Sequence, residues 1–230
     1  MGEGKAREFR MLDGQIVHLL HGWIGFGAAA AALVALAVRK GGLVHRRAGW
    51  VFVAGMVFTA LTTWFFMIVR PLPLAMVSSA ITLYAVGKAL LAVNPHLRAA
   101  RALEWGLFAF LVLAMLGMLA TSANLYRAGS NLFVAPLAMF AIFAVFATLD
   151  VRFLRAANLS RVDRLRRHAL YMALTVSQMV MAPTIIVAPD IGLPVPAIVF
   201  GSLLLVPLIY VGFGPATRRA AARDVAADTA

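Results

Sequence analysis

The fold is decided by one stretch, IVHLLHGWIGFGAAAAALVALAV at Ile16–Val38, which ends directly before Arg39 and Lys40. It holds 23 residues and no Asp, Glu, Lys or Arg. An uncharged apolar stretch of this length is what an α-helix needs to cross a bilayer core about 30 Å thick. The stretch therefore predicts a transmembrane helix.

Six further apolar stretches of similar length follow along the chain. They are Trp50–Val69, Leu72–Val93, Leu103–Ala123, Leu132–Leu149, Ala169–Ala188 and Val195–Phe213. Hydrophobic residues make up 63% of the chain and charged residues 13%, outside the range of a soluble globular domain. We therefore predict an all-α integral membrane bundle of about seven transmembrane helices. A single transmembrane domain is expected at 15–214, between a short polar tail at 1–14 and a C-terminal tail at 215–230.

The basic residues outside these stretches predict the orientation of the chain. Five lie on the side of the N-terminus: Lys5, Arg7, Arg10, Arg70 and Arg127. Fifteen lie on the opposite side: Arg39, Lys40, Arg46, Arg47, Arg98, Arg101, Arg152, Arg155, Arg161, Arg164, Arg166, Arg167, Arg218, Arg219 and Arg223. Because cytoplasmic loops are enriched in Lys and Arg, this asymmetry places the N-terminus outside and the C-terminal tail in the cytoplasm.

The same asymmetry accounts for the net charge of +12 without a nucleic-acid partner. The predicted partner is the lipid bilayer, and a homo-oligomer or a membrane partner protein stays open. The chain contains no cysteine, which excludes disulfides, iron–sulfur clusters and thiolate nucleophiles. No spacing typical of serine hydrolases, metalloproteases or phosphate loops is present. No catalytic residue is predicted, and a membrane oxidoreductase is the enzyme class left open.

Two histidines in the first stretch are candidates for binding an ion or a ligand. His18 and His21 are three residues apart, so they share a helical face with Gly22 and Gly25. Small residues let helices approach closely, so we expect this face to look into the bundle, where an imidazole can meet a cofactor, an ion or a hydrogen-bond partner. Gln178 lies near the middle of the sixth stretch, where an amide without a partner is costly. A path for protons or a small solute along these residues is one reading, and ordinary hydrogen bonding is the other.

A second polar layer is predicted at the cytoplasmic ends of the helices. His45 precedes the second stretch, Asp150 follows the fifth and His168 precedes the sixth. If these ends meet, Asp150 orients the imidazoles or shares a metal with them, and otherwise all three are interfacial polar groups. His45 and His168 lie at matching depth on different helices, as the axial ligands of a b-type haem must. Lys88 either snorkels to the interface or pairs with Glu104.

These residues resemble the pattern of a bacterial family of multi-pass inner-membrane proteins that share a domain of unknown function. The likeness lies between Ile16 and Met181 and is carried by His21-Gly22, Arg39-Lys40-Gly41-Gly42, His45-Arg46, Gly49, Met56, Asp150-Val151-Arg152, Arg167-His168 and Met172. The chain departs from the family pattern at Ala169-Leu170-Tyr171, where the family has an aromatic and a basic residue. The resemblance implies a location in the bacterial inner membrane and supplies no activity.

Three functions stay open from the sequence. The first is binding or transport of a small ligand or ion within the bundle, with Asp150 and Gln178 among the polar groups that face it. The second is a membrane redox protein that holds haem b between His45 and His168. The third is a scaffold whose basic cytoplasmic loops bind anionic lipid or a partner protein.

Overall fold

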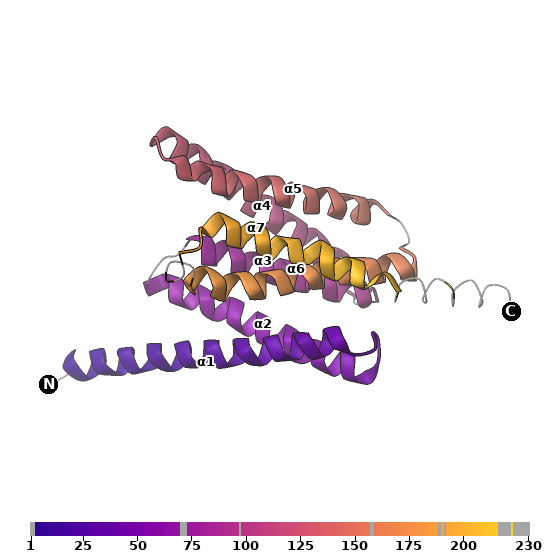
Figure 1. Cartoon of the computed structure of the whole chain (residues 1–230), viewed down its shortest axis with the longest axis horizontal. Coiled ribbons are helices and arrows are strands. Elements are labelled where there is room, and N and C mark those ends of the chain that lie inside the picture. The colour runs from indigo at the N-terminus through magenta and orange to yellow at the C-terminus, as the bar shows by residue number, and fades with distance from the viewer. Residues whose placement is uncertain are drawn as a thin grey trace. The chain divides into compact units, whose positions relative to one another are not determined.

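The computed structural model describes residues 3–69, 73–96, 98–156, 159–187, 190, 192–215 and 222. Within these residues the chain forms seven α-helices, one short 3₁₀ turn and no strand (Figure 1): α1 (Glu3–Ala37), α2 (Leu43–Val69), α3 (Pro73–Val93), α4 (Ala100–Arg127), η1 (Asn131–Phe133), α5 (Val134–Arg155), α6 (Arg161–Val187) and α7 (Val195–Gly212). The predicted all-α class is confirmed. Several predicted positions lie outside the described residues: Arg70, Leu72, Ala188, Arg218, Arg219, Arg223 and most of the 215–230 tail.

Five helices of the described residues are long and apolar enough to cross a membrane. The candidate spans are Gln15–Ala37, Leu43–Phe66, Ala75–Val93, Ala100–Arg127 and Pro136–Arg155. The segment Ala197–Gly212 of α7 is a shorter apolar helix. Such helices are those of a membrane protein, because each can satisfy its backbone hydrogen bonds internally while it exposes apolar side chains to lipid. The count of seven spans and the direction of the chain stay predictions.

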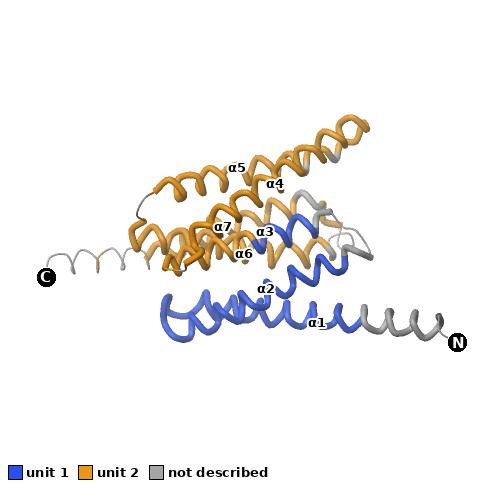
Figure 2. Tube along the Cα trace, turned by 180° about the vertical axis from the view of Figure 1, so that it is seen from behind, with its two compact units in different colours: residues 1–83 blue, residues 84–230 orange. Residues whose placement is uncertain are grey.

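The chain divides into two compact units, residues 1–83 and 84–230, with the boundary inside α3 (Figure 2). In the first unit α1 packs along α2. The two helices approach closely where a small residue faces another, since a Cβ added at Gly55 would lie 2.7 Å from the Cβ of Ala28. In the second unit α4 packs against α5 and α6 packs against α7. A single bundle over 15–214 stays a prediction.

Three helices begin well before their apolar stretches, and α1 begins at Glu3, in the segment that was expected to be a polar tail. α2 begins at Leu43 and α6 at Arg161, so His45 and His168 lie on helices rather than in loops. The start of α6 has a local cause: the Ser160 hydroxyl oxygen accepts the backbone N–H of Asp163 at 3.0 Å and its hydroxyl donates to the Asp163 carboxylate at 2.6 Å. This capping arrangement satisfies helix donors that would otherwise have no partner. Hydropathy marks the apolar part of a helix and not its first turns.

Candidate functional site

Six polar side chains from four helices of the second unit are buried together. They are Tyr84 and Lys88 from α3, Glu104 from α4, Asp150 from α5, and Arg167 and Tyr171 from α6. Each is no more than 8% exposed to solvent. We call these six residues the buried ionic cluster. Its two cations and two carboxylates balance in formal charge, which is the condition under which charges are tolerated away from water.

Helical spacing explains how α3 and α6 contribute to the cluster. Tyr84 and Lys88 are four residues apart on α3, and Arg167 and Tyr171 are four residues apart on α6. Residues at this spacing lie on one face of a helix. Each of these helices therefore presents a cation and a phenol one turn apart, in opposite order along the chain. The two phenol rings pack edge to face with centroids 5.6 Å apart.

Asp150 is the centre of the cluster. The Lys88 Nζ atom lies 2.7 Å from its Oδ2 atom, and the Tyr84 hydroxyl donates to the same oxygen at 2.8 Å. The Tyr171 hydroxyl donates to Oδ1 at 2.5 Å, and Arg167 Nη2 lies 3.4 Å from that oxygen. An ionised carboxylate only accepts hydrogen bonds, and each of the two Asp150 oxygens faces two donor groups.

Glu104 is held by the other half of the cluster. Arg167 donates to both of its carboxylate oxygens, at 2.6 and 2.5 Å, in the bidentate geometry that guanidinium groups favour. Lys88 Nζ bridges the two carboxylates, because it also lies 3.0 Å from Glu104 Oε2 and donates to the Glu104 backbone carbonyl at 3.0 Å. The Arg167 guanidinium lies over the ring of Phe153 at 4.9 Å from its centroid. Of the two readings for Lys88, pairing with Glu104 is the one that the structure adopts.

The structure gives Asp150 different neighbours from those expected. Its partners are Lys88, Tyr84, Tyr171 and Arg167, and no contact with a histidine is among them. Among the described residues no three His, Asp or Glu side chains lie close enough together to hold a metal ion. Asp150 is therefore oriented by two cations and two tyrosine hydroxyls rather than by imidazoles.

His45 and His168 each bond to a backbone carbonyl. The His45 Nδ1 atom lies 3.0 Å from the Ala35 oxygen in the first unit, and the His168 Nδ1 atom lies 3.0 Å from the Ala89 oxygen in the second. Because a carbonyl only accepts, Nδ1 carries the hydrogen in both rings, and Nε2 bears the lone pair when the ring is neutral. This is the tautomer used by histidines that ligate iron through Nε2. A haem between these two residues stays a prediction.

The outer histidines are paired within the first unit. The His18 ring stacks on Phe66 of α2, with centroids 4.0 Å apart and planes at 5°. His21 Nδ1 lies 2.7 Å from the Thr62 hydroxyl oxygen, also on α2. His18 and His21 therefore both contact α2. Gln178 lies in α6 of the second unit and is 1% exposed. A path that includes His18, His21 and Gln178 stays a prediction.

Sequence reasoning missed the two tyrosines and the pairing of Arg167. Tyrosine is counted as apolar when a span is identified, so Tyr84 and Tyr171 did not stand out inside α3 and α6. The available signal was the spacing, since Tyr84 precedes Lys88 by four residues and Tyr171 follows Arg167 by four. A phenol one turn from a buried cation is a hydrogen-bond donor for the carboxylate that the cation needs.

Comparisons of the chain with protein-family models, with curated proteins and with solved structures found no match. The resemblance to a bacterial membrane-protein family stays a prediction.

Proposed function

We propose that this chain is a multi-pass protein of the bacterial inner membrane that binds and releases a proton at Asp150 while it moves a small ion or solute through the bundle. One observation carries the proposal: a carboxylate that is 0% exposed holds Lys88 Nζ at 2.7 Å and accepts two tyrosine hydroxyls. Ionisable groups among membrane helices are expensive, and they typically mark proton relays and ion pathways.

Asp150 and Glu104 differ in the cation that lies nearest to each of them. Glu104 is held bidentately by Arg167, and a guanidinium stays protonated at any ordinary pH. The nearest cation to Asp150 is Lys88, whose ammonium, unlike a guanidinium, can act as a proton donor. The exchangeable proton of the cluster therefore lies on the Lys88–Asp150 pair.

Proton binding at Asp150 is coupled to movement of the helices by electrostatics. The cluster is neutral with both carboxylates ionised, so one added proton leaves a net charge of +1 in apolar surroundings. An uncompensated buried charge costs several kcal/mol, of the order of 3–5, which opening to water or entry of an anion relieves. Protonation and opening therefore favour each other, which is the linkage that a proton-coupled transporter needs.

The tyrosines supply a route for the proton. The Tyr84 and Tyr171 hydroxyl oxygens lie 3.3 Å apart, and each also bonds one oxygen of Asp150. A hydroxyl both donates and accepts, so its oxygen can bind an incoming proton while its own proton leaves to the next acceptor, and rotation about the C–O bond then restores the starting arrangement. No cavity is needed for a proton, in keeping with side chains that contact one another directly.

Proton flux into liposomes tests the proposal. Purified protein is reconstituted with a pH-sensitive dye in the lumen, and a potassium gradient with valinomycin drives protons inward. We expect lumenal acidification with the natural chain and its loss with Asp150→Asn. The matched control is Asp163→Asn, whose side chain is 45% exposed and pairs with Arg166 at 3.8 Å, and it keeps the flux. Flux equal to that of protein-free liposomes, or flux unchanged in Asp150→Asn, contradicts the proposal.

A b-type haem on His45 and His168 is the second proposal. Each ring, taken within its own unit, has the Nδ1 hydrogen bond to a backbone carbonyl that haem-ligating histidines commonly make. After expression with ample haem, the purified protein should show a Soret absorbance band that His45→Ala and His168→Ala each remove. A natural chain without this band contradicts the haem proposal and leaves the proton proposal standing.

A further inference from the structure

The buried ionic cluster lies near one end of the second unit. Lys88 is five residues before the end of α3, and Asp150 is five residues before the end of α5. Glu104 is four residues after the start of α4, and Arg167 is six residues after the start of α6. At 1.5 Å per residue, each of them lies about 6–9 Å from the end of its helix. This end of the unit carries the α3–α4 and α5–α6 connections, so a proton that arrives there has a short distance to cover.

Within the cluster the phenols lie deeper than the cations. Tyr84 is about one helical turn farther from the end of α3 than Lys88 is. Tyr171 is likewise about one turn farther from the start of α6 than Arg167 is. Asp150 contacts both layers, because each of its two oxygens accepts a tyrosine hydroxyl and lies beside a cation. The hydroxyls therefore lead from Asp150 away from the helix ends, and the cations lie on the side of the helix ends.

Glu104 is the member of the cluster that reaches the surface. Its side chain is 11% exposed, whereas the side chains of Lys88 and Asp150 are 0% exposed and that of Arg167 is 5% exposed. Arg101, almost one turn earlier on α4, is exposed, and charged side chains of this kind lie where a membrane helix meets water. Water at this end of the unit therefore touches the Glu104 side chain without any movement of the helices.

Lys88 joins Glu104 to Asp150 through one nitrogen atom. Its Nζ atom lies 3.0 Å from Glu104 Oε2 and 2.7 Å from Asp150 Oδ2. Both distances are those of hydrogen bonds, and an ammonium group has three hydrogens to donate. The three side chains therefore form an unbroken line of hydrogen bonds from the surface to Asp150.

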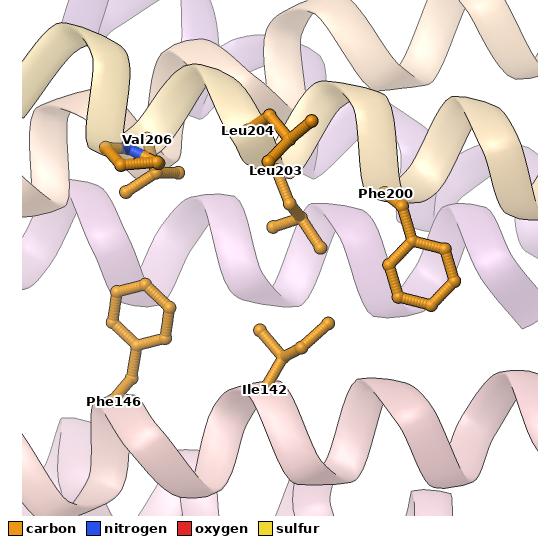
Figure 3. A pocket seen from close by; sticks show the side chains of 7 residues that line it. Ile142, Phe146, Phe200, Leu203, Leu204 and Val206 are labelled. Atoms are coloured by element: carbon orange, nitrogen blue, oxygen red, sulfur yellow. The ribbon is translucent and has the colours of Figure 1, made fainter.

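The crevice between α5 and α7 gives protons no second way into the cluster. Ile142 and Phe146 of α5 face Phe200 and Leu203 of α7 across it (Figure 3). It approaches the cluster, because the ring centroids of Phe146 and Tyr171 lie 6.1 Å apart. Among the described residues that line it, every side chain is apolar, and an apolar side chain binds no proton.

We propose that Glu104 is the residue through which Asp150 takes up and releases its proton. The inference rests on the proposed function and adds the place of entry. A proton from water binds to a Glu104 oxygen. Lys88 then passes one of its three ammonium protons to Asp150 Oδ2 and receives the proton of Glu104. One proton has entered, Asp150 is a neutral acid, and Lys88 and Glu104 are again an ammonium and a carboxylate. Release follows the same steps in reverse.

The rate of proton uptake after a step in pH tests this assignment. The full chain in lipid is mixed rapidly with acid, and the carboxylic-acid C=O band of Asp150 is followed by time-resolved infrared spectroscopy to a pH at which it saturates. Glu104→Gln keeps the size of the side chain and one hydrogen-bonding oxygen, but carries no proton onward. We expect the band to rise more slowly by about tenfold or more, because a positioned acid or base typically speeds proton transfer by roughly 10²-fold or more.

Three further variants separate proton entry from structural support. Glu104→Asp keeps a carboxylate and should be faster than Glu104→Gln. Asp163→Asn removes a carboxylate whose side chain is 45% exposed, and it should keep the natural rate. If Glu104→Gln does not fold because Arg167 is left unpaired, it is combined with Arg167→Gln. This double variant leaves Lys88 and Asp150 as a neutral pair, and the same slow rate is expected.

The entry residue and the proposed function fail separately. A band that Asp150→Asn removes, but that rises in Glu104→Gln or in the double variant less than about tenfold more slowly than in the natural chain, overturns entry at Glu104 alone. A Glu104→Asp protein as slow as Glu104→Gln also overturns it. A natural chain without the band overturns proton binding at Asp150, and the entry residue with it.

Discussion

The first unit and the second unit treat polar side chains in opposite ways. On α1, His18 stacks on Phe66 and is exposed, and His21 bonds to one threonine hydroxyl and is half-buried. In the second unit Lys88 and Asp150 are fully buried and draw partners from four helices. The difference teaches that a neutral polar group in an apolar helix can lie beside a single neighbour, whereas a buried charge needs a counter-charge and several hydrogen-bond partners.

The two units also differ in what brings their helices together. α1 and α2 approach through Gly55 and Ala28, and van der Waals packing at small residues is enough for such a pair. The helices α3, α4, α5 and α6 are joined by the ion pairs of the buried ionic cluster. A shift of one helix along its axis would break these ion pairs. Substitutions in the first unit should therefore have smaller effects than substitutions in the buried ionic cluster, and the predictions below test this order.

The largest effect is expected from Asp150→Ala. It leaves Lys88 buried without its nearest counter-charge, so the free energy of unfolding in detergent should fall by about 3–5 kcal/mol. Asp163→Asn is the control, because its exposed ion pair with Arg166 is worth about 0–1 kcal/mol. If the free energy of unfolding fell equally in the two variants, the buried carboxylate of Asp150 would stabilise the protein no more than the exposed carboxylate of Asp163.

Removal of the charges of both Lys88 and Asp150 should restore part of the free energy of unfolding that Asp150→Ala loses. Lys88→Met combined with Asp150→Leu replaces the pair by apolar side chains, which a buried site often tolerates. The double-mutant cycle should show a coupling free energy of up to about 3 kcal/mol between the two positions. Chemical or thermal unfolding of the four proteins measures it, and strictly additive losses would mean that Lys88 and Asp150 do not stabilise each other.

A smaller effect is expected from Gly55→Ala in the first unit. The new Cβ would lie 2.7 Å from Ala28 Cβ, so α1 and α2 must move apart, at a cost of about 1–2 kcal/mol. Gly27→Ala, whose added Cβ meets nothing within 4 Å, is the control and should not destabilise the protein. A Gly55→Ala protein as stable as the Gly27→Ala protein would argue against close packing at this point.

The smallest effect is expected from Thr62→Val. It removes the hydrogen bond between the Thr62 hydroxyl and His21, which is worth about 1 kcal/mol. Thr63→Val is the control, because the Thr63 hydroxyl bonds only to the Thr59 carbonyl in its own helix. The difference in unfolding free energy between the two variants isolates the contact between α1 and α2. A difference of zero would assign His21 no part in holding the helices together.

The helical class followed from the sequence because each apolar stretch is long enough to span a bilayer, and this property belongs to local sequence. The buried ionic cluster could not be predicted from the sequence, because its hydrogen-bonded partners are 16 to 87 residues apart and only the packing of the helices brings them together. Lys88 and Glu104 were found as a candidate pair since both are charges at the ends of neighbouring spans. Tyr84 and Tyr171 were hidden by their apolar rings, although their spacing from a cation was visible.

The most direct test of the central claim is infrared difference spectroscopy of the protein in lipid during a step in pH. If Asp150 takes up a proton, the spectrum gains a carboxylic-acid C=O band that is absent in Asp150→Asn and retained in Asp163→Asn. A spectrum without this band in the natural chain, or with the same band in Asp150→Asn, would contradict proton binding at Asp150.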